Sequence, residues 1–148
     1  MKAAPTLDGR VRIDPESELD LLVLRAVIPD ATSRGDSLSG NVSGRMNSEV
    51  EADWREFVEP DLQRTFDDQL SHVAKTLSGA AAGKPIFIER EQAETWFGAL
   101  NQARLSLEDK YRFHEPGAPR SGGDYRTARV RSNFYQILQG LLLEFLMQ

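Results

Sequence analysis

Two polar side chains interrupt the apolar stripe of the segment "ETWFGALNQARLSLEDKY", residues 94–111. At about 100° per residue along a helix, Arg104 projects between Phe97 and Tyr111, and Asn101 borders the stripe one turn earlier. A planar guanidinium beside an amide has the geometry to hold an anion or a peptide carboxylate. Because an arginine stays protonated, its head group must otherwise reach solvent or meet an acceptor.

The residue pattern favours a structural role for Arg104. Its methylene groups would pack on aromatic side chains while the guanidinium pairs with a carboxylate or with a carbonyl at a helix end. The candidate carboxylates are Glu18, Glu56 and Glu59. On this interpretation Arg104 orders the packing of the helices. If Asn101 and Arg104 instead bind a ligand or a substrate, both must line one concave pocket.

A second group of candidate binding residues consists of arginines. They are Arg120 in a loop and Arg126, Arg129 and Arg131 near the start of the last helix, where we expect these last three to be exposed. Residues 112–148 carry five arginines against three acids, whereas residues 50–79 carry seven acids against three basic residues. The two segments either face each other, lie in water, or leave the arginines free to form a partner surface. The net charge of −5 argues against general nucleic-acid binding, because phosphate neutralisation dominates that affinity.

The other reactive residue types give weaker signals. The chain has no cysteine, which excludes disulfides, thiolate metal sites and cysteine nucleophiles. His72 follows Asp68 by one turn but projects away from the apolar stripe of its helix, and His114 lies in a loop. No phosphate-binding glycine loop, nucleophile elbow or metal motif occurs. We therefore predict no catalytic residue, no metal site and no cofactor, and we leave enzymatic activity as an open, less favoured alternative.

Two short segments with alternating apolar residues position the first and the third helix. "GRVRID" and "KPIFIERE" are typical of half-buried strands, and they can pair as a small ribbon. After the first strand, Asp14 should cap a helix with Pro15 at its first position, and Pro29 should end that helix near residue 28. Its expected inward side chains are Leu19, Leu22, Val23, Ala26 and Val27, and Leu21, Leu24 and Ile28 widen this apolar stripe.

The remaining pattern is helical. A helical segment from Val50 to Gly79 should break near Pro60, and the last helix should run from Tyr125 to Leu146. Glycine and serine or proline enrichment predicts mobile loops near residues 31–49 and 114–124. The fold class we predict is mainly α: a compact bundle of four or five helices with a small two-stranded β ribbon, in a single domain spanning residues 1–148.

The last helix is more apolar than one inward-facing stripe requires. "YQILQGLLLEFLMQ" places apolar side chains around much of its circumference. Either this helix is the central one and is buried on all sides, or part of it contacts a second copy or another protein. The first explanation is favoured.

Four segments together resemble the blocks of the bacterial DUF2017 family. They are "GRVRIDPESELDLLVLRAVI", "EFVEPDLQRTFDDQLSHVAKTL", "AETWFGALNQARLSLEDKY" and "FYQILQGLLLEFL". The most specific block of that family reads W-L-x-A-L-N-D-x-R-L; Trp96, Leu100, Asn101, Arg104 and Leu105 match it. Gln102 stands where the family pattern usually has an acid. The resemblance implies a helical, cytoplasmic bacterial protein and no particular reaction; proximity of some family genes to the Clp-protease adaptor associates the family with regulation.

The leading functional hypothesis is a noncatalytic protein-binding or regulatory module with an unknown protein partner or with a second copy of itself as a homodimer. One alternative is a transcription-linked factor that contacts DNA through the arginines, and another is an unrecognised enzyme that uses Asn101 and Arg104. The chain begins without a signal-peptide pattern and contains no apolar run long enough to cross a membrane, so we expect a cytoplasmic protein.

Overall fold

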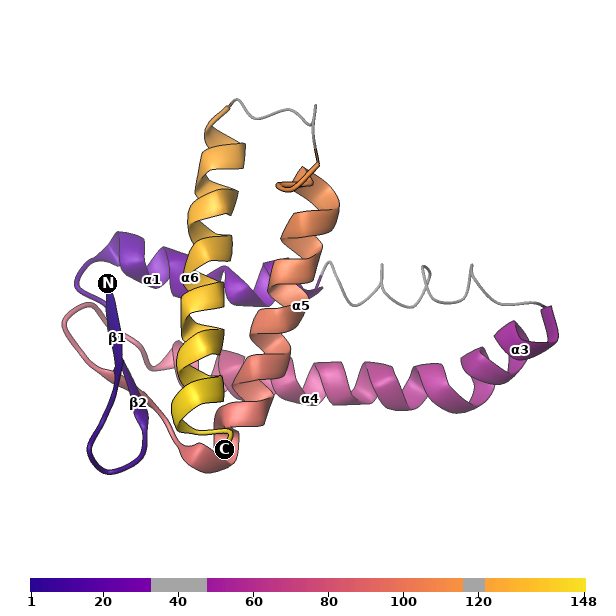
Figure 1. Cartoon of the computed structure of the whole chain (residues 1–148), viewed down its shortest axis with the longest axis horizontal. Helices are drawn as coiled ribbons and strands as arrows, with labels where there is room; N and C mark the ends of the chain where they lie inside the picture. Colours follow the sequence, from indigo (N-terminus) through magenta and orange to yellow (C-terminus); the bar gives the residue numbers. More distant parts are fainter. Residues whose placement is uncertain (33–47, 116–121) are drawn as a thin grey trace.

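The computed structural model describes three stretches of the chain, residues 1–32, 48–115 and 122–148 (Figure 1). The elements are, in order, β1 (Lys2–Pro5), β2 (Val11–Asp14), α1 (Glu18–Arg25), α3 (Ser48–Asp53), the π-helix η1 (Trp54–Val58), α4 (Glu59–Ser78), β3 (Ile86–Ile88), the 3₁₀ helix η2 (Arg90–Gln92), α5 (Ala93–Tyr111) and α6 (Gly123–Phe145). Helices dominate, which confirms the predicted mainly α fold with a small β component.

The β component is a three-stranded antiparallel sheet with the order β1-β2-β3. The predicted pairing of the two alternating segments is confirmed, since Val11 faces Ile88 and Ile13 faces Ile86 across the β2–β3 ladder. These four side chains are buried, whereas Arg12 between them is exposed. The strand β1 was missed because "KAAP" lacks the apolar alternation that identified the other two strands.

The first helix differs from the prediction at both ends. Its N-cap is Ser17, whose side chain accepts a hydrogen bond from the Asp20 backbone N–H, and not Asp14, which ends β2. The helix ends at Arg25, and a second helical segment begins at Val27 and includes Pro29. A proline in the first turn of a helix needs no N–H donor, so Pro29 is accommodated there and does not stop the helix.

The predicted inward face of α1 was also partly wrong. Leu21, Leu24 and Val27 are buried, while Leu19 and Leu22 are 69% and 64% exposed. Both faces of this segment are leucine-rich, so periodicity alone did not select the one that packs against the rest of the molecule.

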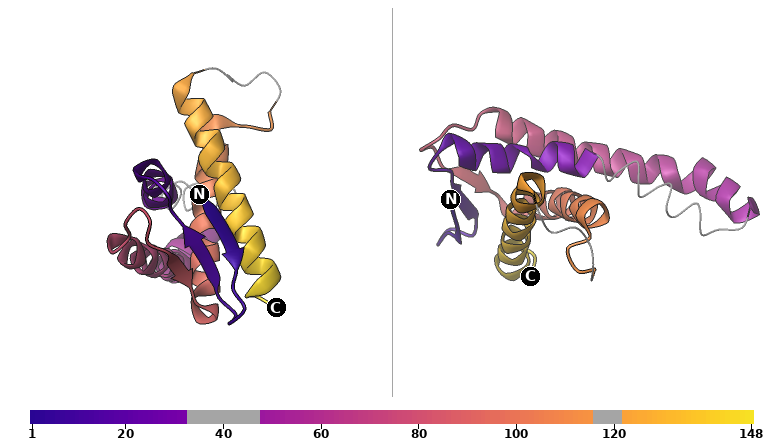
Figure 2. Two further views of the ribbon diagram at one scale, coloured as in Figure 1. Left: turned by 90° about the vertical axis from the view of Figure 1, so that its left-hand side faces the viewer. Right: turned by 90° about the horizontal axis from the view of Figure 1, so that it is seen from above.

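The helices form two crossing layers. Helices α1 and α4 run side by side in one layer, and α5 and α6 lie side by side across them in the other, with the sheet at one end (Figures 1 and 2). Apolar side chains from both layers and from the sheet meet between them. The largest fully buried side chains include Trp96, Leu100, Tyr135, Leu138 and Leu142. Gly98 of α5 lies against the Gln69 side chain of α4, and a Cβ at position 98 would displace that amide, because it would lie 2.4 Å from Gln69 Nε2.

Helix α4 is longer than the layer it belongs to. Its C-terminal half packs in the core through Val73 and Leu77 and ends at Gly79, as predicted. Its N-terminal half projects away from the rest of the chain together with α3 and η1 (Figure 1). The predicted kink or break near Pro60 is not a break, because the π-helix η1 continues directly into α4, of which Pro60 is the second residue. We call the projecting residues 48–68 the arm.

Helix α6 is not buried on all sides. Its inward face contributes Tyr135, Leu138 and Leu142 to the core, but Val130 and Ile137 are 59% and 60% exposed. The helix begins at Gly123, two residues before the predicted start. Most of the two predicted loops, residues 33–47 and 116–121, lies outside the described chain; residues 31 and 32 are helical, and so are Ser48 and Glu49.

Candidate functional site

Arg104 lies on the edge of α5 that faces α6. The neighbouring side chains Leu100, Ala103 and Leu107 turn into the core and are buried, and Arg104 itself is half-buried. This placement follows from the helical period, because residue 104 projects about 40° from residue 100. The head group is therefore carried out of the core and into the seam between the two helices.

The partner of Arg104 is an amide and not a carboxylate. Its Nη1 donates a hydrogen bond of 2.6 Å to Gln139 Oε1 on α6. The proposed pairing with Glu18, Glu56 or Glu59 is wrong, since Arg104 forms no ion pair with any acid in the described stretches. Arg104 Nε is buried and has no acceptor.

Gln139 fixes this arrangement from the opposite helix. It is only 4% exposed. While its oxygen accepts from Arg104, its Nε2 donates to the Phe97 carbonyl oxygen at 3.5 Å. The amide therefore bridges two positions of α5, about two turns apart, and holds the Arg104 head group in a defined place between the helices.

A pocket with a volume of about 310 Å³ opens on this seam. It combines polar side chains of both helices with a small apolar area. Its lining consists of Asn101, Arg104, Leu105, Glu108, Phe113, His114, Arg129, Ser132, Asn133 and Gln136. We call it the α5–α6 pocket. The residues that the sequence grouped as a possible clamp, Asn101 and Arg104, therefore do share a concave site.

The comparison with protein families gives one match. A family model described as "Domain of unknown function (DUF2017)" matches residues 3–146, nearly the whole chain. The chain belongs to the DUF2017 family. No curated protein and no solved structure matches the chain. Within the described parts of this DUF2017 protein, no helix is long and apolar enough to cross a membrane.

The four arginines of the predicted basic surface have different surroundings. Arg129 lines the α5–α6 pocket, where its guanidinium lies 5.4 Å from the Phe113 ring centroid. Arg126 is exposed and does not line that pocket. Arg131 was expected to be exposed, and this is wrong because it pairs with Asp30 at 2.9 Å. The fourth, Arg120, lies outside the described residues.

Four residues of α6 that line or support the pocket were not predicted from the sequence. They are Ser132, Asn133, Gln136 and Gln139. A signal was present for the three amides, because they recur at every third residue of the helix and so project in neighbouring directions.

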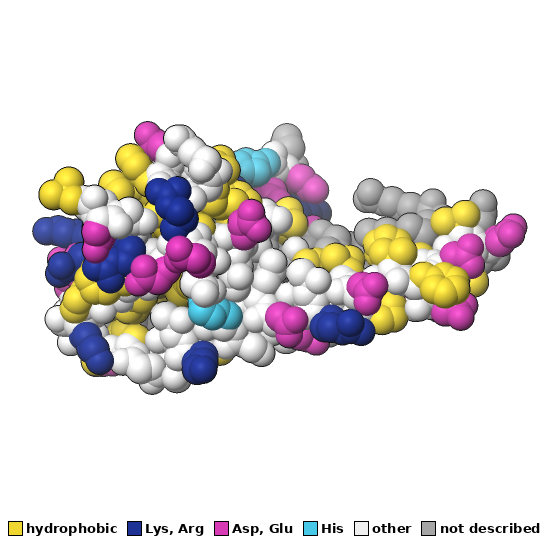
Figure 3. All heavy atoms as spheres, turned by 90° about the horizontal axis from the view of Figure 1, so that it is seen from below, with side chains coloured by type: hydrophobic (Ala, Val, Ile, Leu, Met, Phe, Trp, Pro, Cys, Tyr) yellow, Lys and Arg dark blue, Asp and Glu magenta, His cyan; other side chains and the backbone are white. Residues whose placement is uncertain are grey.

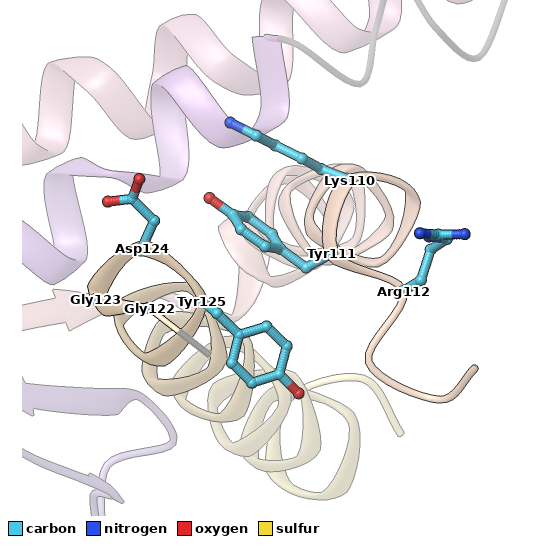
Figure 4. A pocket seen from close by; sticks show the side chains of 7 residues that line it. All are labelled: Lys110, Tyr111, Arg112, Gly122, Gly123, Asp124 and Tyr125. Atoms are coloured by element: carbon cyan, nitrogen blue, oxygen red, sulfur yellow. The ribbon is translucent and has the colours of Figure 1, made fainter. Parts of the chain in front are cut away.

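A second pocket of about 420 Å³ lies where the C-terminal end of α5 meets the N-terminal end of α6 (Figure 4). Stacking between Tyr111 and Phe113 and an edge contact between Tyr111 and Tyr125 build its aromatic side. The side chains of Lys110 and Arg112 extend in different directions, so the two cations do not converge on one ligand (Figure 4). We assign this pocket no role.

The two histidines contribute little to a metal or proton-transfer site. His72 is partly exposed and lines a shallow depression between α4 and α5 together with Asp68. His114 is exposed, and its Nε2 lies 3.9 Å from a Glu108 carboxylate oxygen. Among the residues that the structure describes, no group of three or more metal-ligating side chains occurs.

The arm presents apolar side chains to solvent. Val50, Phe57 and Val58 are 47%, 65% and 43% exposed. Figure 3 shows apolar side chains spread along the projecting part of the molecule and interspersed with acids. Of the described elements, α3 and η1 pack mainly against each other and against the start of α4. The Trp54 indole Nε1 is buried without a hydrogen-bond partner. The arm therefore has as many apolar side chains as a helix of a protein core, but few of the described elements pack against it.

Proposed function

We propose that this DUF2017 protein is a noncatalytic protein-binding module whose docking element is the arm. The observation that carries the proposal is the exposure of Phe57 and Val58 on a helical extension that leaves the two-layer body (Figures 1 and 3). Large apolar side chains gathered on a projecting helix are typical of a surface that a partner covers. Such a helix suits a partner with an apolar groove.

The charge of the arm restricts the kind of partner. Residues 48–68 contain eight acids against two arginines, a net charge of −6. Two of the acids are engaged locally, since Glu51 pairs with Arg55 at 2.7 Å and Asp61 lies 3.6 Å from Arg64. Two arms packed against each other would bring like charges together, which disfavours association. The partner surface that fits the arm is an apolar groove with basic residues around it.

The test is site-specific crosslinking followed by affinity measurement. Phe57 is replaced by a photoreactive phenylalanine analogue in native cells, and Leu7, fully exposed on the turn between β1 and β2, takes the same analogue as control. We expect a protein captured only from position 57. With that protein purified, Phe57→Ser and the double variant Glu56→Lys/Asp61→Lys should each weaken binding by about tenfold or more, and added salt should weaken it further.

Two results would contradict the proposal: equal capture from both positions, or an affinity that neither variant changes. Because Phe57 is mostly exposed, Phe57→Ser should leave the unfolding free energy within about 0.5 kcal/mol of wild type. A loss of binding in this variant would therefore not result from unfolding. Light scattering of the same samples tests the homodimer that was an alternative in the sequence-based hypothesis and that the charge of the arm disfavours; a monomeric mass at high concentration contradicts a homodimer.

The structure bears differently on the two alternative functions, DNA contact and catalysis. Of the three described arginines proposed for DNA contact, Arg126 and Arg129 are exposed, whereas Arg131 is engaged by Asp30. The absence of duplex binding at low salt would remove this idea. The enzyme alternative required a concavity containing both Asn101 and Arg104, and the α5–α6 pocket provides one. Among the described residues, Glu108 is the one carboxylate that lines that pocket, and we assign no reaction to it.

A further inference from the structure

We propose that the α5–α6 pocket binds a monocarboxylate, which pairs with the guanidinium of Arg104. This site is separate from the arm, and it does not depend on the proposed docking function. Three observations support it: an arginine without a counter-ion, a neighbouring amide that fixes its position, and a pocket wall whose groups match one negative charge.

Arg104 lacks the anion that a half-buried arginine normally has. Of its three guanidinium nitrogens, only Nη1 has a hydrogen-bond acceptor in the described chain, and that acceptor is the neutral Gln139 oxygen. A cation that is partly removed from water and paired only with an amide is under-compensated. An added carboxylate would supply the missing charge, and the planar guanidinium would meet it with parallel donors.

The arginine is also held in position before a ligand arrives. Gln139 is buried and accepts from Arg104 while donating to the Phe97 carbonyl oxygen. Arg104 therefore does not need to give up many rotamers when it binds, which lowers the entropic cost of binding. Gln139 acts through Arg104 and is a positioning residue.

The wall of the pocket sets the charge and size of the ligand. Arg104 and Arg129 face a single lining acid, Glu108, which leaves a net charge of +1 with His114 neutral. One negative charge on the ligand balances this, whereas a dianion would leave an excess. Further hydrogen-bonding side chains come from Asn101, Ser132, Asn133 and Gln136, and apolar area comes from Leu105 and Phe113.

The volume of about 310 Å³ is at the small end of ligand pockets. It fits a carboxylate attached to one short apolar side chain and one amide. Two sources supply that chemistry, namely a small free acid and the C-terminal residue of a peptide. Both present the same carboxylate to Arg104 and differ in whether the remaining amides of the pocket are used.

The experiment is a titration followed by NMR of the arginine Nε–H groups and the backbone amides. The probes are 4-methylpentanoate, N-acetyl-leucine, N-acetyl-leucinamide and inorganic phosphate. We expect both carboxylates to bind and to shift the NMR signals of Arg104 and of the pocket residues. The uncharged leucinamide should bind with an affinity at least about tenfold lower. Similar affinities for the two acids identify a small free acid as the ligand class, and tighter binding of N-acetyl-leucine identifies a peptide end.

Two matched variants test whether carboxylate binding depends on Arg104 itself or on the positive charge of the surface in general. Arg104→Gln should weaken carboxylate binding by about tenfold, whereas Arg126→Gln, which removes the same charge from an exposed position of α6 outside the pocket, should leave it unchanged. If Arg104→Gln does not fold, Arg129→Gln provides the test in its place. Arg129 is an exposed residue of the pocket, so its replacement should also weaken carboxylate binding.

The proposal is overturned by any of four results. These are no shift at pocket residues with either acid, equal shifts with the leucinamide, tighter binding of phosphate than of the carboxylates, and equal weakening by the pocket variant and by Arg126→Gln.

Discussion

Two arginines, each in a seam of α5 or α6, differ in whether they have an acidic partner. We call the site of Arg131 completed, because a carboxylate pairs with the guanidinium, and the site of Arg104 incomplete, because none does among the described residues. Where α6 meets the segment after α1, Arg131 donates to both Asp30 oxygens at 2.9 and 3.3 Å, and Tyr135 donates to the same carboxylate at 2.9 Å. In the seam between α5 and α6, Arg104 meets only Gln139. Both arginines are half-buried, yet only one has a counter-ion.

The difference separates a structural role from a binding role. Burial opposes the charge of Arg131, but the adjacent Asp30 carboxylate outweighs it, so the pKa of Arg131 is raised above its ordinary value. Asp30, Arg131 and Tyr135 line neither the α5–α6 pocket nor the pocket at the C-terminal end of α5. Arg104, by contrast, lines a pocket and keeps unused donors. A satisfied arginine stabilises the fold, whereas an unsatisfied one beside a pocket is available to a ligand.

The largest effect should come from removing the shared carboxylate of the completed site. Asp30→Ala leaves Arg131 with a mostly buried charge and removes the acceptor of Tyr135. We expect a loss of about 3 kcal/mol in the free energy of unfolding, measured by urea denaturation followed by circular dichroism. Asp61→Ala is the control, since its pair with Arg64 is largely exposed, and it should cost less than about 0.5 kcal/mol. Equal losses would show that the Asp30 site has no special role in stability.

An intermediate effect should appear at high pH. Burial, and next to it the Asp30 carboxylate, raise the pKa of the Tyr135 hydroxyl above its ordinary value. The folded state therefore keeps this proton, while the unfolded chain releases it near pH 10. Stability from Tyr135 should be fully present below about pH 10 and should fall as the pH rises further.

Urea denaturation between pH 8 and 11.5 measures this dependence. Tyr135→Phe should make the alkaline decline shallower, after an initial cost of about 1 kcal/mol for the lost hydrogen bond at neutral pH. Tyr125→Phe, which removes a hydroxyl from a less buried tyrosine, should leave the slope as in wild type. An unchanged slope in Tyr135→Phe would contradict the assignment.

The smallest effect should come from the incomplete site. Replacing Arg104 by methionine removes an unpaired charge and costs one hydrogen bond, so the unfolding free energy should stay within about 1 kcal/mol of wild type. Arg131→Met, measured in parallel, should cost about 3 kcal/mol, because it leaves Asp30 without its cation. If the two variants lose the same stability, Arg104 is a structural residue, as the sequence pattern favoured.

Much of the fold could be predicted from local patterns. The alternation in "GRVRID" and "KPIFIERE" gave two strands and their pairing, and the end of α4 at Gly79 followed from backbone chemistry. The errors occur where two local solutions have similar energy. Pro29 can end one helix or begin another, and the leucines of α1 populate both of its faces, so tertiary packing decided each case.

The candidate site was predicted in part. Helical spacing placed Asn101 and Arg104 side by side at the edge of an apolar stripe, and both line the same pocket. Spacing could not provide the partner of Arg104, because Gln139 is 35 residues away and is brought near only by the antiparallel packing of α5 and α6. For the same reason Arg131 was grouped with a surface to which it does not belong.

The sequence by itself determined which segments are helical, which residues share a helix face, and that Arg104 must find an acceptor, because these properties depend on neighbours within about one turn. Only the tertiary structure decided which acceptor Arg104 pairs with, which arginine pairs with a carboxylate, and which apolar helix faces are exposed to solvent. These outcomes depend on which helices pack against each other, and that choice is made by the summed burial of side chains far apart in the chain.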